Sequence, residues 1–254
     1  MILEDIVEKK REEIEKLKSV ESSLAEELKR GKISLIAEIK KASPSAGVIE
    51  ENFSPLGRLK NYEKGGAGAI SVLTDEKFFA GSPRILNEVS SHTNLPVLRK
   101  DFILDEIQIY ESLILGADCI LLIGEILNQK KLAELLDLAY EYNLEALVEV
   151  HSRETLLKVL ETSARMIGIN NRNLEDFSVN LETTGMILNE LEKKSSRKDY
   201  LVVSESGISS REDIDRLRAL GVDGVLIGEA LMKAGDPERK IRKLFAGSTF
   251  KEEE

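Results

Sequence analysis

The chain has one cysteine, Cys119, two histidines and no tryptophan among its 254 residues. A single cysteine cannot form a disulfide within the chain, and it excludes a zinc site built from several cysteines. The two histidines, His92 and His151, also argue against a histidine-rich metal site. The composition therefore predicts neither a disulfide-stabilised fold nor a metal centre built from cysteine or histidine.

Positive charge is in deficit, with 36 lysines and arginines against 46 aspartates and glutamates and a net charge of −10. A nucleic-acid-binding protein needs a basic surface, so this balance argues against a nucleic-acid partner while leaving room for a local anion site. No apolar run approaches the roughly 18 residues of a membrane span, and the opening MILEDIVEKKREE is too charged for the apolar core of a signal peptide. We therefore expect a cytoplasmic protein with no membrane partner.

Hydrophobic residues make up 42% of the chain, enough to bury a sizeable core. Short apolar runs alternate with helical stretches, and they lack the period-2 pattern of half-exposed strands, which is typical of parallel strands buried on both faces. The runs are Leu35–Ile39, Ala69–Leu73, Val97–Leu98, Cys119–Ile123, Ala146–Val150, Met166–Ile169, Leu201–Val203 and Gly224–Ile227. Ser209 with Glu212 fits a capping box and predicts the start of a late helix.

Similar segments recur along the chain at intervals of about 50 residues, the length of two strand-helix units. They are GGAGAISVL (65–73), GADCILLI (116–123), SARMIGIN (163–170) and GVDGVLIG (221–228). Eight strand-helix units predict an α/β fold of the (β/α)8 TIM-barrel type. An open doubly wound sheet is the alternative, but it needs no closing repeat, and no GxGxxG motif follows the first run.

We interpret the chain as a single domain, 1–254, with three parts. Residues 1–32 are expected to form an N-terminal helical extension, residues 33–245 the barrel, and residues 246–254 a charged C-terminal tail. In the extension, Ser23 with a glutamate three residues later fits a capping box. We expect the extension to lie across the barrel mouth or against the barrel's flank.

Charged and polar residues stand at the ends of the apolar runs, where TIM barrels carry their active residues. Any one of these residues alone is explained by a buried strand that reaches solvent at its end, with no functional role. Lys40, Lys100 and Glu149 together favour catalytic use, because charges on buried strands are costly unless they are paired or used. The sequence therefore predicts that acids and bases converge on one mouth of the barrel.

Two glycine turns follow the seventh and eighth runs, at Ser206-Gly207 and Gly228-Glu229. TIM barrels often bind phosphate between these two loops through backbone N–H groups and a short helix N-terminus, and glycine lets the backbone approach an anion closely. Simple turn formation is the alternative for each turn alone. The pair favours a phosphate site, to which Glu229 would contribute only its backbone.

Seven segments, in order and at spacings suited to one barrel, resemble the indole-3-glycerol-phosphate synthase family. They are IAEIKKASPSAG (36–47), SVLTDEKFFAGS (71–82), LRKDFILDEIQI (98–109), EALVEV (145–150), IGINNRNL (167–174), SESGI (204–208) and LIGEALM (226–232). The charged N-terminal extension is also similar to that of the family. Ala46 departs from the pattern, because family members often carry a lysine after the SPS element.

The resemblance implies a carbon-carbon lyase of tryptophan biosynthesis. The implied reaction closes the ring of 1-(2-carboxyphenylamino)-1-deoxyribulose 5-phosphate and yields indole-3-glycerol phosphate, carbon dioxide and water. It needs no metal and no organic cofactor. The expected partner is therefore a small-molecule phosphosugar substrate, and we expect the chain to be a monomer.

Matched by position, the resemblance also implies roles for individual residues. Lys100 is the candidate general acid for the ribulose carbonyl oxygen, and Glu149 the base of the dehydration. Lys40, aided by Glu38, is either the dehydration acid or the holder of the substrate carboxylate. The substrate-binding residues are Asn170, Arg172, Glu205 and Ser206, with Phe102 and Leu121 in the anthranilate pocket. The phosphate-binding residues are Ser43, Gly207, Gly228 and Glu229.

Three other functions stay open on the sequence alone. The chain could be a phosphoribosylanthranilate isomerase, a class I aldolase that uses Lys100 as a Schiff-base nucleophile, or a non-catalytic barrel that binds a phosphometabolite. A lysine beside carboxylates stays charged, which favours proton donation over Schiff-base chemistry. The combination of Lys40, Lys100 and Glu149 suits ring closure better than isomerisation.

Overall fold

The computed structural model describes residues 22–43, 47–48, 53–173 and 177–246. Most of the predicted helical extension and nearly all of the predicted C-terminal tail lie outside the described residues. Within those ranges, no helix combines the length and the apolar character needed to cross a membrane.

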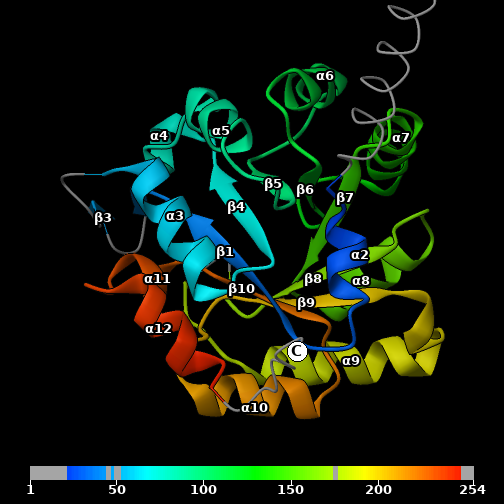
Figure 1. Ribbon diagram of the computed structural model, residues 1–254. Helices are drawn as coiled ribbons and strands as arrows, with labels where there is room; N and C mark the ends of the chain where they lie inside the picture. Colours follow the sequence, from blue (N-terminus) through cyan, green and yellow to red (C-terminus); the bar gives the residue numbers. More distant parts are fainter. Residues whose placement is uncertain (1–21, 44–46, 49–52, 174–176, 247–254) are drawn as a thin grey trace, which may run out of the picture.

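Eight parallel strands close into a barrel surrounded by helices (Figure 1), so the predicted TIM barrel is confirmed and the open sheet is excluded. Around the barrel the strands are β1 (Ser34–Ile39), β4 (Ala69–Leu73), β5 (Val97–Lys100), β6 (Cys119–Ile123), β7 (Glu145–Val150), β8 (Met166–Asn170), β9 (Leu201–Glu205) and β10 (Gly224–Ile227). Two further short strands, β2 (Ala42–Ser43) and β3 (Gly47–Val48), pair with each other outside the barrel. Each predicted apolar run forms a strand, and several strands extend to the polar residue that follows the run.

The strands lack period-2 patterning because both of their faces are buried. One set of side chains fills the barrel interior, and it includes Ile36, Leu98, Leu121, Leu147 and Val203. The alternate side chains face outward and pack under the helices, as Ala37, Ile70, Ile120, Val148 and Val202 do. A buried parallel sheet therefore reads as continuous apolar sequence.

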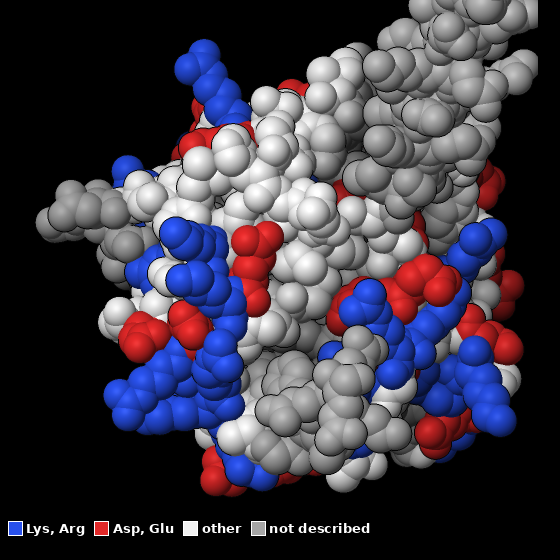
Figure 2. Space-filling view, viewed as in Figure 1, with Lys and Arg blue, Asp and Glu red and all other residues white. Residues whose placement is uncertain are grey.

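Helices surround the strands, and all of those in the described residues except α4 bury apolar side chains against the barrel. They are α2 (Leu24–Leu28), α3 (Pro55–Gly65), α4 (Glu76–Phe79), α5 (Pro83–Ser90), α6 (Glu106–Ile114), α7 (Gln129–Glu141), α8 (Arg153–Leu160), α9 (Glu182–Lys194), α10 (Arg211–Ala219), α11 (Glu229–Met232) and α12 (Pro237–Leu244), with a 3₁₀ turn at Arg197–Asp199. Their outer faces carry charges of both signs, and lysines and arginines gather over α3 and α12 (Figure 2).

The capping box of α10 lies one residue later than the predicted pair of Ser209 and Glu212. Ser210 is the N-cap, and its hydroxyl accepts from the N–H of Asp213. The Asp213 carboxylate in turn accepts from the N–H groups of Ser209 and Ser210, at 2.9 and 2.8 Å. The sequence offers two overlapping pairs, Ser209 with Glu212 and Ser210 with Asp213. In the structure, Ser210 and Asp213 form the capping box, because each side chain accepts from the backbone N–H of the other residue.

Helix α2 closes the N-terminal end of the barrel, so the described part of the predicted extension covers neither the mouth nor the flank. Leu24 and Leu28 belong to the apolar cluster of the barrel interior. Glu145, the first residue of β7, accepts from the N–H of Leu24 and from the hydroxyl of Ser23, both at 2.7 Å. The two leucines complete a core that would otherwise meet water at that end.

Candidate active site

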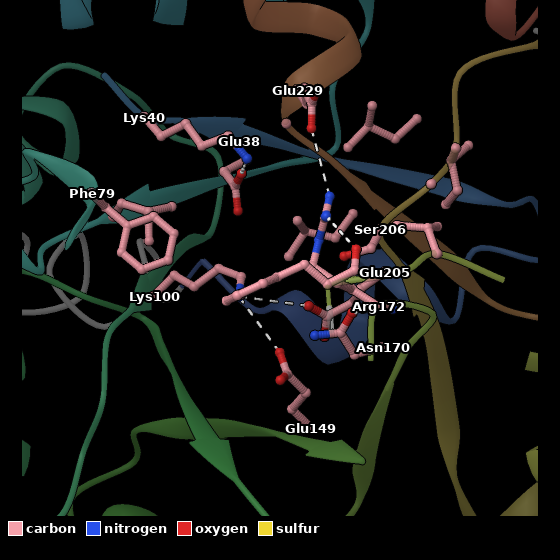
Figure 3. A pocket seen from close by; sticks show the side chains of 18 of the residues that line it. Glu38, Lys40, Phe79, Lys100, Glu149, Asn170, Arg172, Glu205, Ser206 and Glu229 are labelled. Carbon is pink, nitrogen blue, oxygen red and sulfur yellow. Dashed lines mark hydrogen bonds and ion pairs between the residues drawn. The ribbon is translucent and has the colours of Figure 1, made fainter. Parts of the chain in front are cut away.

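A cavity of about 940 Å³ opens at the C-terminal ends of the strands (Figure 3). Charged side chains stand on the strand ends, and Figure 3 shows Lys100 directed toward the carboxylates of Glu149 and Glu205. Aromatic and aliphatic side chains from the strand ends and from the loops and helices that follow them form the rest of the wall, and they include Phe79 and Phe102. The cavity can therefore hold a ligand that has both an apolar ring and several polar groups.

Lys100 is the last residue of β5, and its side chain points into the barrel mouth. Its Nζ lies 3.5 Å from Glu149 Oε2 and 3.9 Å from Glu205 Oε2. Burial alone would lower the pKa of Lys100, but neighbouring carboxylates, led by Glu149 and Glu205, outweigh burial and raise the pKa above its usual value. The side chain is therefore an ammonium group at neutral pH.

Glu205 ends β9 and is almost fully buried beside Glu149. Burial, followed by the proximity of Glu149, raises the pKa of Glu205 to about 8. Gly168 on β8 leaves room for this position of the carboxyl group, since a Cβ there would lie 2.2 Å from Glu205 Oε1. Glu205 is therefore mostly protonated at neutral pH, while an ammonium group lies close by.

Two buried carboxyl oxygens at the cavity, Glu149 Oε2 and Glu205 Oε1, have no hydrogen-bond partner in the described part of the chain. The contact between Glu149 and Lys100 is a long ion pair rather than a well-formed hydrogen bond. Native proteins rarely leave buried polar atoms unsatisfied outside functional sites. These oxygens are therefore available to bond a ligand or to exchange a proton with one.

Glu38 and Lys40 form a second ion pair at the end of β1, with 2.6 Å between Lys40 Nζ and Glu38 Oε1. Burial pushes the pKa of Glu38 upward, but the ammonium groups of Lys40 and Lys100 outweigh burial, and the pKa is lowered overall. Gly228 packs against this pair, because a Cβ there would lie 2.0 Å from Glu38 Oε1. The acid of this pair is therefore ionised at neutral pH.

Arg172 and Glu229 link the end of β8 to the start of α11. Arg172 Nη2 lies 3.6 Å from Glu229 Oε2, and Lys233 Nζ lies 2.6 Å from Glu229 Oε1. The hydrogen bond from Lys233 is the main reason that the pKa of Glu229 is lowered. Both Glu229 oxygens thus face cations, which leaves the backbone of the Gly228 turn as the part suited to an anion.

The structure brings together at this cavity all but two of the residues that the sequence singled out: Glu38, Lys40, Lys100, Phe102, Glu149, Asn170, Arg172, Glu205, Ser206, Gly207, Gly228 and Glu229. Ser43 belongs to β2, but its side chain lies outside the described part of the chain. Leu121 does not line the cavity and instead fills the barrel interior.

Ile123 takes the place that was predicted for Leu121. It pairs with Glu149 across β6 and β7, whereas Leu121 pairs with Leu147, one inward-facing position deeper. Strand alternation gives the correct direction for both residues, but only the register of the closed barrel tells which of them reaches the mouth.

Sequence reasoning did not single out Ile126, Phe177, Val179 or Lys233, which also line the cavity. Lys233 is the exception that carries a signal, because it follows Glu229 at the i,i+4 spacing of a helical ion pair. Phe177 and Val179 reach the cavity because their segment folds back, with a bridge between Val179 and Arg172. No local sequence pattern predicts that Phe177 and Val179 reach the cavity.

A sequence model of the family described as indole-3-glycerol phosphate synthase matches residues 3–244. An indole-3-glycerol phosphate synthase from Petrotoga mobilis is 58% identical over 245 residues, which cover 96% of this chain and 97% of the relative. The enzyme of the same name from Desulforamulus reducens is 46% identical over 260 residues, covering 96% of this chain and 97% of the relative.

Solved structures share the fold at much lower sequence identity. A 3-hexulose-6-phosphate synthase from Salmonella typhimurium has a TM-score of 0.61 at 15% identity, over 84% of this chain and 96% of that chain. A chain of the tryptophan synthase complex from Pyrococcus furiosus has a TM-score of 0.61 at 18% identity, over 84% and 97%. These structures support the fold alone. On the sequence matches, the chain belongs to the indole-3-glycerol phosphate synthase family.

Proposed function

We propose that this protein is an indole-3-glycerol phosphate synthase. It converts 1-(2-carboxyphenylamino)-1-deoxyribulose 5-phosphate into indole-3-glycerol phosphate, carbon dioxide and water. The convergence of Lys40, Lys100 and Glu149 on one cavity carries the proposal. Family membership supports it independently.

The first step is ring closure. The aromatic carbon that bears the carboxylate attacks the keto carbon of the ribulose chain, a carbon–carbon bond forms, and the carbonyl electron pair moves onto oxygen. Lys100 gives that oxygen a proton, and its ammonium charge stabilises the developing negative charge. The raised pKa of Lys100 keeps it protonated and ready for this role.

Decarboxylation and dehydration follow. The carbon–carbon bond to the carboxylate breaks, carbon dioxide leaves, and the bonding electrons restore the aromatic ring. Glu149 then removes a proton from the carbon beside the nitrogen, an acid protonates the hydroxyl group, and water leaves as the indole double bond forms. Glu149 Oε2 accepts no hydrogen bond within the described residues and has only a long ion pair to Lys100, which supports the role of Glu149 as the base.

Two roles fit Lys40, which is held at 2.6 Å by Glu38. It can donate the proton that expels water, or it can bind the substrate carboxylate before that group leaves. In both roles Glu38 orients the ammonium group. The two roles differ in their effect on kcat and KM, which provides a test.

The rest of the cavity suits the two ends of the substrate. The turns at Gly207 and Gly228 provide backbone N–H groups for the phosphate. Phe102 and Ile123 provide an apolar wall for the anthranilate ring. Asn170, Arg172 and Glu205 lie between these ends and would bond the ribulose hydroxyls. Holding the two reacting ends of one flexible molecule together supplies much of the rate.

Adding the carboxyphenylamino substrate to the purified protein tests the proposal. We expect indole fluorescence to appear, and we expect one molecule of carbon dioxide to be released for each indole product formed. The chain has no tryptophan, so its own fluorescence in that range is low. Substrate binding without either product would favour a non-catalytic barrel, and carbon dioxide release without indole would reject the dehydration step.

Borohydride reduction in the presence of substrate separates this mechanism from a class I aldolase. The proposed proton transfer forms no covalent adduct, so we expect the mass of the protein to stay unchanged. A reduced adduct on Lys100 would support Schiff-base chemistry instead.

We further propose that the enzyme acts as a monomer in the cytoplasm on this phosphosugar, without a metal or organic cofactor. Sedimentation at micromolar concentration should give the mass of one chain, and activity should survive extensive treatment with a chelator. A stable dimer or a loss of activity that added metal restores would contradict this.

A further inference from the structure

Asn171 is a buried polar residue that directly follows Asn170 but does not line the cavity. Its side-chain amide is fully engaged. Nδ2 lies 2.8 Å from the carbonyl oxygen of Glu205, 3.2 Å from that of Ser206 and 3.0 Å from Ser204 Oγ. One side chain after β8 is therefore bonded to three consecutive residues at the end of β9.

The residues that Asn171 holds form an unusual turn. Ser206 and Gly207 have φ angles of +67° and +79°, both in the left-handed region. Glycine adopts this conformation freely, whereas a serine there is strained unless its surroundings fix it. The carbonyls of Glu205 and Ser206 belong to the peptide groups on either side of the Ser206 Cα. The backbone N–H of Asn171 also donates to the Glu205 carbonyl, at 2.9 Å. The side-chain amide adds a second bond there and supplies the bond to the Ser206 carbonyl, so that both peptide planes beside the strained residue are held.

The other end of the amide is anchored in the core. Asn171 Oδ1 accepts from the N–H of Thr184 at 3.2 Å and from its hydroxyl at 2.8 Å. The Thr184 hydroxyl also lies 2.8 Å from Ser204 Oγ, and both of these side chains are fully buried. The amide orientation is thus set by α9, so the Nδ2 group cannot turn away from the carbonyls.

We propose that Asn171 is a positioning residue that holds the Ser206–Gly207 turn in its anion-binding shape. The inference rests on the proposed function, in which this turn binds the substrate phosphate. Asn171 acts through the backbone of Ser206 and Gly207 and does not touch the substrate. Its loss therefore weakens phosphate binding more than it slows the chemistry.

Asn171→Ala and Thr184→Val form a matched pair for the test. Both changes remove part of the same buried network. Thr184→Val, however, keeps the Asn171 amide that bonds the two carbonyls, and it keeps the backbone N–H of residue 184 that orients this amide. We expect Asn171→Ala to raise the Kd for inorganic phosphate, and KM for the substrate, about tenfold, with a smaller effect on kcat. We expect Thr184→Val to lower the Tm while leaving phosphate affinity close to wild type.

Ser206→Gly in the Asn171→Ala background provides a rescue. Glycine adopts a left-handed conformation without strain, so the double variant should recover most of the lost affinity for inorganic phosphate. Because Ser206 itself lines the cavity, the rescue is scored against the same change in the wild-type background. A purely structural role for Asn171 predicts equal phosphate affinity in Asn171→Ala and Thr184→Val and no rescue, and either result overturns the inference.

Amide hydrogen exchange at Ser206 and Gly207 in the ligand-free protein separates this inference from the phosphate site itself. We expect faster exchange in Asn171→Ala than in wild type or Thr184→Val. If the wild-type protein fails to bind inorganic phosphate, the proposed phosphate site is wrong, yet exchange still decides whether Asn171 holds the turn. Equal exchange in all three proteins shows that it does not.

Discussion

Lys100 lies near carboxyl groups whose pKa values are shifted in opposite directions. Glu38 is ionised because two lysines outweigh its burial, whereas burial and a neighbouring acid raise the pKa of Glu205. One cavity thus holds an ionised acid, a protonated acid and an ammonium group at neutral pH. This separation of pKa values is how enzymes place proton donors and acceptors side by side.

Glu205→Gln tests the raised pKa through stability. The folded protein binds a proton on Glu205 up to about pH 8, whereas the unfolded chain releases it near the ordinary value of 4.5. The stabilisation from this group is therefore complete at acid pH and is lost as the pH rises through 8. Urea unfolding from pH 5 to 9 should show the wild type losing stability relative to Glu205→Gln. Parallel curves would contradict the raised pKa.

Lys40→Met decides between the two roles of Lys40. Because Glu38 holds its ammonium group in the same cavity as Lys100, we expect an acid role, with kcat lowered about 10²-fold or more and KM little changed. Steady-state kinetics by indole fluorescence measures both constants. A raised KM with an unchanged kcat would identify Lys40 as the anchor of the substrate carboxylate.

Strands and helices set which residues reach the cavity and which support it. Ile123 lies level with Glu149 in the barrel, while Leu121 lies one inward position deeper. Leu24 and Leu28 of α2 close the opposite end. We therefore expect substitutions near the mouth, as at Ile123, to change activity, and substitutions deeper in the barrel or in α2 to change stability.

Ile123→Ala and Leu121→Ala separate the two inward positions of β6. We expect Ile123→Ala to raise KM about tenfold, because it removes wall contacts with the anthranilate ring. Leu121→Ala should lower the free energy of unfolding by about 2–5 kcal/mol and leave KM near the wild-type value. Kinetics and urea unfolding measure the two effects, and a raised KM in Leu121→Ala alone would restore the sequence-based prediction.

Leu24→Ala tests the closure of the barrel by α2. It should lower the free energy of unfolding by about 2–5 kcal/mol, because it opens a cavity in a buried cluster, while kcat and KM per folded molecule stay unchanged. Ile114→Ala on the exposed face of α6 is the control and should change stability by less than about 0.5 kcal/mol. Equal stability of the two variants would show that α2 adds nothing to the core.

Over the whole molecule, local sequence signals predict the barrel and most of the polar side chains that line the cavity. The apolar runs recur in a repeat, and parallel strands of a closed barrel bring their C-terminal ends together by topology alone. Lys40, Lys100 and Glu149 are therefore predictable as neighbours although they are far apart in the chain.

The features that escaped prediction depend on three-dimensional packing. The depth of Leu121 in the barrel depends on strand register. The position of α2 depends on which end of the barrel needs to be covered. The contacts of Val179 depend on how its segment folds back onto Arg172. Asn171 resembles any polar strand-end residue in sequence. Only the left-handed turn beside it indicates its function.

The rate of indole formation by Lys100→Met tests the central claim most directly. We predict a kcat lowered by about 10²–10⁴-fold, the contribution of a positioned proton donor, with the Tm of a folded barrel retained. Lys130→Met on the surface of α7 is the matched control, because its side chain is 89% exposed, and it should keep the wild-type rate. A wild-type rate in Lys100→Met would contradict the mechanism.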